Sequence, residues 1–234
     1  PNDSLFYKDR PDPILDPGKP KFEPLLTTED QLLSPPDTGR IILTPVPVKE
    51  TFKVNHLVFL VDVSGSMMAD GKMDLLKASM IELCNTLRPE DRVTLIVYSS
   101  TARVVMENVP GNEKNLIIDK IQNMEGTGYT AGSEAMKKAY EVAQKNFIQG
   151  GNNMVIMATD GAFNLYTSDV MPTVKKYRKR GISTSIVAIK NTDRDAKSMQ
   201  TIALEGGGRY IPITNMEQAR AGLTEEVRTA SRAE

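Results

Sequence analysis

The class of fold follows from one segment of the chain, Leu57-Val58-Phe59-Leu60-Val61-Asp62-Val63-Ser64-Gly65-Ser66-Met67. Its first five residues are apolar, which is typical of a central parallel strand that is covered on both faces. The carboxylate of Asp62 directly follows this apolar run, and two serines, Ser64 and Ser66, follow at alternate positions. An ionised group at the end of a buried strand is costly unless it has a partner. We therefore expect a buried strand that ends in a polar site.

Downstream of this segment, apolar strand-length runs alternate with amphipathic helix-length runs. The expected strands cover residues 92–98, 102–106, 153–159, 182–189 and 209–213. The expected helices cover residues 73–87, 114–124, 131–147, 170–180, 195–205 and 216–229. This alternation predicts an α/β fold with a doubly wound, mostly parallel central sheet flanked by helices. The strands at 92–98 and 102–106 are so close in sequence that we expect a hairpin, which adds one short antiparallel edge strand.

The composition of the chain excludes several classes of protein. The 234 residues are 40% hydrophobic and 25% charged with a formal net charge of -1, as in an ordinary globular protein and unlike a disordered or nucleic-acid-coating one. The single cysteine, Cys84, cannot form an internal disulfide. The apolar run 57–61 is far shorter than the roughly 18 residues that a membrane span needs.

Proline divides the chain into two parts. Ten of the fourteen prolines fall within the first 53 residues. Because proline is excluded from helix interiors and central strands, we expect residues 1–53 to form an extended, proline-rich segment. This segment is either a linker that spaces the domain from a surface or an arm that packs on the domain. Residues 54–234 form the predicted α/β domain.

Ligands of such a sheet bind beyond the carboxyl ends of its strands, where the strand order reverses. Asp62, Ser64 and Ser66 follow the first strand, and Asp160 follows the strand at 153–159. A glycine-rich loop at 126–132 adds Thr130, whose hydroxyl can serve as a further ligand or cap the next helix. Oxygen ligands without histidine or cysteine suit a hard divalent cation such as Mg²⁺. The sequence therefore predicts a metal site at these strand ends.

Three elements occur in order: Asp-x-Ser-x-Ser after the first strand, a threonine in a glycine-rich loop, and Thr159-Asp160-Gly161 after a later strand. Over about residues 54–230 they resemble the von Willebrand factor A domain, above all its bacterial members. The resemblance implies a Rossmann-like fold with a metal-ion-dependent adhesion site. It implies that Ser64 and Ser66 bind Mg²⁺ directly, Thr130 directly or through water, and Asp62 and Asp160 mainly through water. We expect that Mn²⁺ or Ca²⁺ can substitute for Mg²⁺ at this site.

The threonine ligand has an alternative. The glycine-rich loop reads Gly-Thr-Gly-Tyr-Thr, so Thr127 competes with Thr130 for this role. We favour Thr130 because the following Ala131-Gly132 matches the bacterial pattern.

Loops that follow the strands should form the rim of the metal site. We expect this rim to contact a partner, since exposed aromatic side chains favour protein interfaces. The alternative is that some of these side chains pack beneath the loops. The predicted rim residues are Met67, Tyr129, Phe163, Asn164 and Tyr166.

An enzyme is not expected. Ser64 or Ser66 would need a general base to act as a nucleophile. The only histidine, His56, is interpreted as a strand-edge residue at the other end of the first strand, roughly 20 Å from Ser64 at about 3.3 Å per residue. The basic run at 175–180 is read as a solvated helix end, so we expect no nucleic-acid partner.

We therefore predict a divalent-metal-dependent protein-binding module of the adhesion or scaffold type. In it, as the resemblance implies, Mg²⁺ bridges to an Asp or Glu carboxylate of a protein partner. The alternative is an accessory subunit that docks a substrate onto a separate ATPase or chelatase-type machine. We favour an extracytoplasmic location, periplasmic or at the cell surface, with a tether upstream.

Overall fold

The computed structural model of the chain describes residues 51–125, 132–161, 167–191 and 193–233. Most of the proline-rich segment 1–53 therefore lies outside the described residues, and its conformation stays a prediction. Among the helices that the structure describes, none is both long enough and apolar enough to cross a lipid bilayer.

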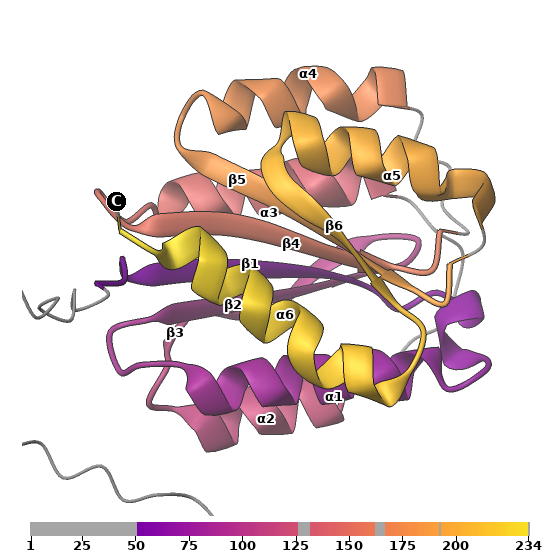
Figure 1. Ribbon diagram of the computed structural model, residues 1–234, viewed down its shortest axis with the longest axis horizontal. Helices are drawn as coiled ribbons and strands as arrows, with labels where there is room; N and C mark the ends of the chain where they lie inside the picture. The colour runs from indigo at the N-terminus through magenta and orange to yellow at the C-terminus, as the bar shows by residue number, and fades with distance from the viewer. Residues whose placement is uncertain (1–50, 126–131, 162–166, 192, 234) are drawn as a thin grey trace, which may run out of the picture. The chain divides into compact units, whose positions relative to one another are not determined.

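The described residues contain a six-stranded sheet with the order β3-β2-β1-β4-β5-β6 (Figure 1). All neighbouring strands run parallel except β2 and β3, which are antiparallel. The predicted doubly wound, mostly parallel sheet is thus confirmed. The strands are β1 (Asn55–Asp62), β2 (Arg92–Tyr98), β3 (Ala102–Pro110), β4 (Asn152–Thr159), β5 (Ile182–Ile189) and β6 (Gly207–Ile213).

Helices cover both faces of this sheet (Figure 1). One face carries α1 (Lys72–Thr86), α2 (Lys114–Gln122) and α6 (Met216–Ser231). The other face carries α3 (Gly132–Lys145), α4 (Thr167–Arg178) and α5 (Asp193–Glu205). A short 3-10 helix, η1 (Gly65–Met68), joins β1 to α1. This is the three-layer arrangement that alternating strands and helices favour.

Strand β1 is central to the hydrophobic core. All eight of its residues are buried. Phe59 packs in the cluster beneath α1 and α6, whereas Val58 and Leu60 pack in the cluster beneath α3. Complete burial of such a side chain contributes about 1.5–3 kcal/mol. His56 lies at the beginning of β1, away from Ser64 as predicted, but it is fully buried and not exposed at a strand edge.

The antiparallel edge strand is longer than predicted. We expected it over 102–106, but β3 continues to Pro110. Its pairing with β2 shifts register on both sides of Leu95. Asn108 lies in the irregular stretch with a positive φ of 53°. Its backbone N–H donates to the Thr94 hydroxyl at 3.0 Å. The bulge lets β3 resume its pairing with β2 beyond the irregular stretch. The pattern of apolar residues in the sequence does not reveal such a bulge.

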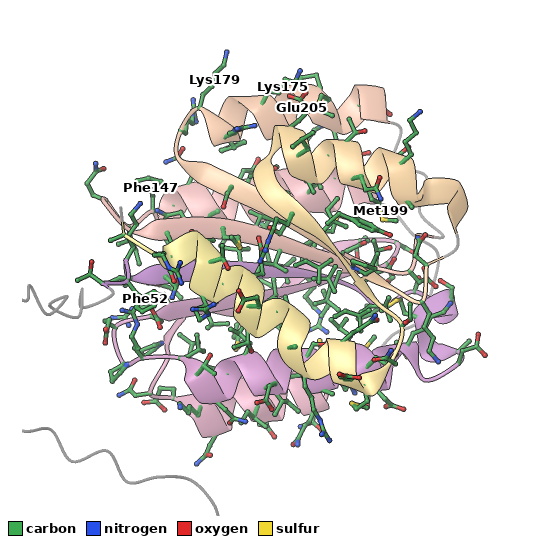
Figure 2. All side chains as sticks on the ribbon, in the orientation of Figure 1. Phe52, Phe147, Lys175, Lys179, Met199 and Glu205 are labelled. Carbon is green, nitrogen blue, oxygen red and sulfur yellow. The ribbon has the colours of Figure 1, made fainter. Side chains whose placement is uncertain are left out.

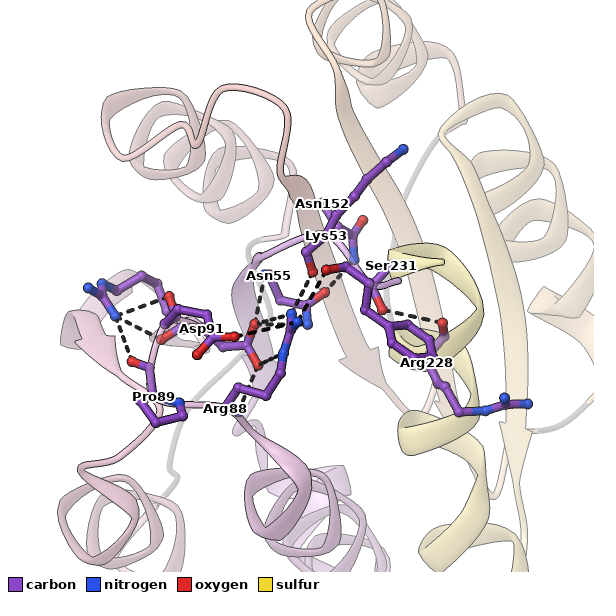
Figure 3. A network of polar contacts seen from close by, with 11 residues as sticks. Lys53, Asn55, Arg88, Pro89, Asp91, Asn152, Arg228 and Ser231 are labelled. Atoms are coloured by element: carbon purple, nitrogen blue, oxygen red, sulfur yellow. Dashed lines mark hydrogen bonds and ion pairs between the residues drawn. The ribbon is translucent and has the colours of Figure 1, made fainter. Parts of the chain in front are cut away.

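A polar network ties the end of the sheet where β1 begins (Figure 3). The buried Asp91 carboxylate accepts from the backbone N–H of Asn55 at 2.8 Å and from Arg88 Nη2 at 2.9 Å. Arg88 Nη2 also donates to the carbonyl of Lys53 at 2.6 Å. The N–H of Lys53 donates to the carbonyl of Ser231 at 2.7 Å. The network joins the entry into β1 to the last turn of α6.

Candidate metal site

The candidate site lies at the opposite end of the sheet, where β1 and β4 finish side by side. The two strands are paired in parallel up to Val61 and Ala158. Asp62 is the last residue of β1, and Asp160 directly follows β4. β1 has β2 on one side and β4 on the other, so the strand order reverses between β1 and β4. This is the position at which open α/β sheets bind ligands.

The loop after β1 folds back so that its side-chain oxygens gather. The Oδ1 atom of Asp62 accepts a hydrogen bond from the backbone N–H of Ser64 at 2.9 Å. The Oγ atoms of Ser64 and Ser66 lie 3.1 Å apart. The N–H of Met67 donates to the carbonyl of Ser64 at 3.1 Å, which closes the first turn of η1. Alternate spacing in the sequence thus produces one cluster of oxygens.

The carboxyl group of Asp62 is fully buried. Its Oδ2 atom accepts from the hydroxyl of Thr159 at 3.1 Å. Burial raises the pKa of Asp62, hydrogen bonds from Ser64 and Thr159 act in the opposite direction, and the nearby Asp160 carboxylate adds to the increase. An ionised Asp62 is therefore destabilising unless a positive charge compensates it. A cation held by this cluster would supply that charge.

Tyr98 at the end of β2 pairs with Asp62 and is fully buried. Burial raises the pKa of the Tyr98 hydroxyl well above its ordinary value, and the Asp62 charge adds to this increase. The phenol therefore stays protonated and adds no negative charge to the site.

Asp160 is held from two sides. Lys72 Nζ donates to Asp160 Oδ2 at 2.8 Å, and Asn191 Nδ2 donates to the Asp160 carbonyl at 3.0 Å. The same ammonium of Lys72 donates to the carbonyl of Ser66 at 3.2 Å. Gly161 has a φ of +84°, and a Cβ there would lie 1.8 Å from Asn191 Nδ2. The glycine after Asp160 is thus required by both its conformation and the close approach of Asn191.

The side-chain oxygens that the structure brings together are of the kind that a hard cation binds. They comprise the carboxylates of Asp62 and Asp160 and the hydroxyls of Ser64 and Ser66, all of them oxygens. Within the described part of the chain, no three His, Cys, Asp or Glu side chains gather into a metal-binding group. A metal at this site would therefore depend on the serine hydroxyls. Oxygen-only ligands with few carboxylates suit Mg²⁺ rather than a zinc-type ion.

Several predicted residues lie outside the described residues: Thr127, Tyr129, Thr130, Phe163, Asn164 and Tyr166. Met67 was predicted on the rim, and this was wrong. Its side chain is 0% exposed and belongs to the core, because the turn of η1 directs it inward. The next residue, Met68, is 41% exposed and takes the surface position instead.

Sequence reasoning did not assign a role to Lys72, Thr159 or Asn191. Thr159 belongs to the Thr-Asp-Gly element and could have been recognised as a hydrogen-bond donor to a neighbouring strand. A lysine directly after Gly71 at the start of a helix was the one available signal for Lys72, since cations are unfavourable at helix N-termini. Asn191 gave no signal, because its contact joins two loops that are distant in sequence.

The basic run is separate from this site. It lies at the end of α4, where Lys175 and Lys179 project outward (Figure 2). Lys175 forms an exposed ion pair with Glu205 at 3.3 Å. This arrangement agrees with a solvated helix end, and the absence of a nucleic-acid partner stays a prediction.

Residues 56–226 match the family model of the von Willebrand factor type A domain. The chain belongs to this family. Such domains are in general protein-interaction modules, typically without enzymatic activity. The family often binds a divalent metal at a metal-ion-dependent adhesion site. The chain, with its carboxylate at the end of β1 and its pair of serines, thus belongs to a family whose common property is the binding of other proteins.

Individual relatives agree with the family assignment. The chain is 33% identical over 182 residues to the uncharacterized protein YfbK of Escherichia coli strain K12, covering 76% of this chain and 32% of YfbK. The chain thus spans about a third of the length of that relative. Among solved structures, the fold is shared with a von Willebrand factor type A protein from Catenulispora acidiphila, with a TM-score of 0.65, 16% identity and coverage of 76% and 43%. It is shared also with the PilB minor pilin from Streptococcus sanguinis, with a TM-score of 0.62, 17% identity and coverage of 79% and 62%.

Proposed function

We propose that this domain is a divalent-metal-dependent protein-binding module of the adhesion or scaffold type. In this proposal Asp62, Ser64, Ser66 and Asp160, together with Thr130, hold Mg²⁺, and a protein partner donates an Asp or Glu carboxylate. The observation that carries the proposal is the cluster of side-chain oxygens around the buried Asp62 at the end of β1. Burial of that carboxylate is costly on its own and becomes favourable beside a cation.

In this proposal the residues of the site have different roles. Ser64 and Ser66 supply neutral hydroxyls, so they orient ligands without adding negative charge. When bound, Mg²⁺ would retain an unsatisfied positive charge and thereby attract a carboxylate oxygen. Thr159 and the N–H of Ser64 keep the Asp62 carboxylate oriented through hydrogen bonds to its two oxygens. A rigid orientation lowers the entropic cost of binding.

We propose no enzymatic activity. Within the described residues, the only histidine is His56. It is buried near the beginning of β1, at the end of the sheet opposite the site. Lys72, the cation beside the serines, is ion-paired with Asp160 and cannot serve as a general base while it holds its proton. Within the described residues, neither His56 nor Lys72 is therefore placed to activate either serine as a nucleophile.

Thermal unfolding of the chain in EDTA and during titration with Mg²⁺ or Mn²⁺ tests this proposal. A ligand at 100 times its dissociation constant stabilises the folded state by about 2.7 kcal/mol. We expect a saturable increase of the melting temperature that is absent from Asp62→Ala and strongly reduced in Ser66→Ala. Ser79→Ala is the matched control, because Ser79 is a buried serine of α1 whose hydroxyl, among the described residues, bonds only to the Leu75 carbonyl. An unchanged response in Asp62→Ala would refute the site.

A binding experiment tests the partner. In the family's manner, binding of a protein partner should disappear in EDTA and return with Mg²⁺. An acidic residue of the partner, when replaced by its amide, should cause the same loss. Binding that survives both treatments would exclude a metal-bridged interaction.

We also propose an extracytoplasmic location. The fold is shared with a minor pilin, which is consistent with this proposal. An antibody against the domain should label cells whose outer envelope is permeabilised while the cytoplasmic membrane stays intact. Labelling only after the cytoplasmic membrane is opened would place the domain in the cytoplasm and contradict the proposal.

A further inference from the structure

Lys72 connects the two halves of the candidate metal site. It is the first residue of α1, and its Nζ lies 2.8 Å from Asp160 Oδ2 and 3.2 Å from the Ser66 carbonyl oxygen. The side chain of Lys72 is 16% exposed and that of Asp160 is 2% exposed. Solvent therefore screens this ion pair far less than it screens a pair on the surface. A full positive charge stands beside residues that we expect to hold a divalent cation.

We propose that Lys72 sets the charge of the site, so that the site holds a divalent cation weakly and accepts a carboxylate readily. This inference rests on the proposed function. Asp62 and Asp160 contribute a formal charge of -2, which Lys72 reduces to -1. With a divalent cation added, the site carries +1 with Lys72 and 0 without it. The positive remainder favours an incoming carboxylate, and the reduced negative charge disfavours the cation.

Lys190 shows that holding the loop does not by itself require contact with a carboxylate. Its Nζ donates to the carbonyl of Asp70 at 2.6 Å, between η1 and α1, whereas the Ser66 carbonyl that Lys72 contacts lies within η1. Both lysines thus contact a backbone carbonyl of residues 65–71, which connect β1 to α1. Lys72 alone, of these two, also contacts a carboxylate of the proposed ligand set. A comparison of the two positions separates an electrostatic role from support of the loop.

Binding of Mn²⁺ to the full chain, followed by the electron paramagnetic resonance signal of the free ion, tests the first half of the proposal. Lys72→Met removes the charge and keeps an apolar side chain of similar length. We expect Lys72→Met to bind Mn²⁺ about tenfold more tightly than the unmodified chain. Lys72→Arg keeps the charge and should bind close to the unmodified affinity. Lys190→Met is the matched control and should also leave the affinity unchanged.

Acetate is the probe for the second half. At constant ionic strength, acetate should strengthen Mn²⁺ binding to the unmodified chain, because the two ligands are coupled through the charge of the site. The effect should be several-fold smaller in Lys72→Met. The affinity for the metal and the response to acetate are therefore expected to change in opposite directions. Loss of a merely structural contact would weaken both.

The outcomes distinguish failure of this inference from failure of the proposed function. Equal or weaker Mn²⁺ binding by Lys72→Met, with normal binding by the unmodified chain, overturns the role of Lys72 and leaves the metal site standing. An undiminished response of Lys72→Met to acetate also overturns it. Absence of Mn²⁺ binding from every variant overturns both proposals. If Lys72→Met does not unfold cooperatively, Lys72→Gln provides the same comparison.

Discussion

Acid should destabilise this domain through His56. The imidazole is fully buried in β1, and within the described residues neither ring nitrogen has a hydrogen-bond partner. Burial lowers the pKa of His56 from 6.5 to about 4, and the charge of Glu107 opposes this decrease only in part. The folded protein therefore keeps the ring neutral at a pH where the unfolded chain already protonates it.

The size of the effect follows from the two pKa values. The difference of about 2.5 units corresponds to about 3 kcal/mol at 1.36 kcal/mol per unit. The sign follows from proton uptake, since the unfolded state binds the proton first as the pH decreases. The contribution to the free energy of unfolding is complete above pH 6.5 and is lost progressively as the pH falls to about 4.

Urea unfolding over this pH range, for the unmodified chain and for His56→Phe, measures the effect. Carboxylates titrate in both proteins, so the difference between the two curves isolates His56. Any packing cost of the phenylalanine is independent of pH and changes only the offset. We expect the unmodified chain to lose about 3 kcal/mol more than the variant between neutral pH and about pH 4. Parallel curves would show that the folded protein accepts the proton on His56 without cost, contrary to this reasoning.

Three further predictions concern the site and its surroundings. Asp62→Asn should increase the stability of the EDTA-treated protein by about 1 kcal/mol in urea, because it removes a buried charge, while abolishing the stabilisation by Mg²⁺. Gly161→Ala should cost about 2 kcal/mol or more, because its φ is +84° and a Cβ would lie 1.8 Å from a neighbouring amide nitrogen. Gly65→Ala is its control, since nothing lies within 4 Å of a Cβ there; equal melting temperatures of the two variants would contradict this account. Met67→Ala should cost about 2–5 kcal/mol in urea unfolding and Met68→Ala less than about 0.5 kcal/mol, and equal effects would refute the inward orientation of Met67.

The order of strands and helices was predictable because it depends on local patterns. The apolar run before Asp62 has the length and composition of a buried strand, and the parallel sheet requires such runs between amphipathic helices. Two carboxylates at strand ends then had to meet at one edge of the sheet, as Asp62 and Asp160 do. The bulge at Asn108 was missed, because a single residue with positive φ leaves the apolar pattern almost unchanged.

The amino-acid sequence by itself determined the parallel sheet and the position of the oxygen cluster, because both depend on the pattern of strands and on their pairing. It also determined the proximity of Ser64 to Ser66, because these residues are neighbours in sequence. Only the tertiary structure decided that Met67 turns into the core and that Lys72 reaches Asp160, a contact between residues 88 positions apart. Periodicity describes which face of an element is apolar, and it carries no information about which distant charge will lie opposite. The pairing of distant charges is decided only when the elements pack together and exclude water, because each buried charge then needs the partner that the fold places beside it.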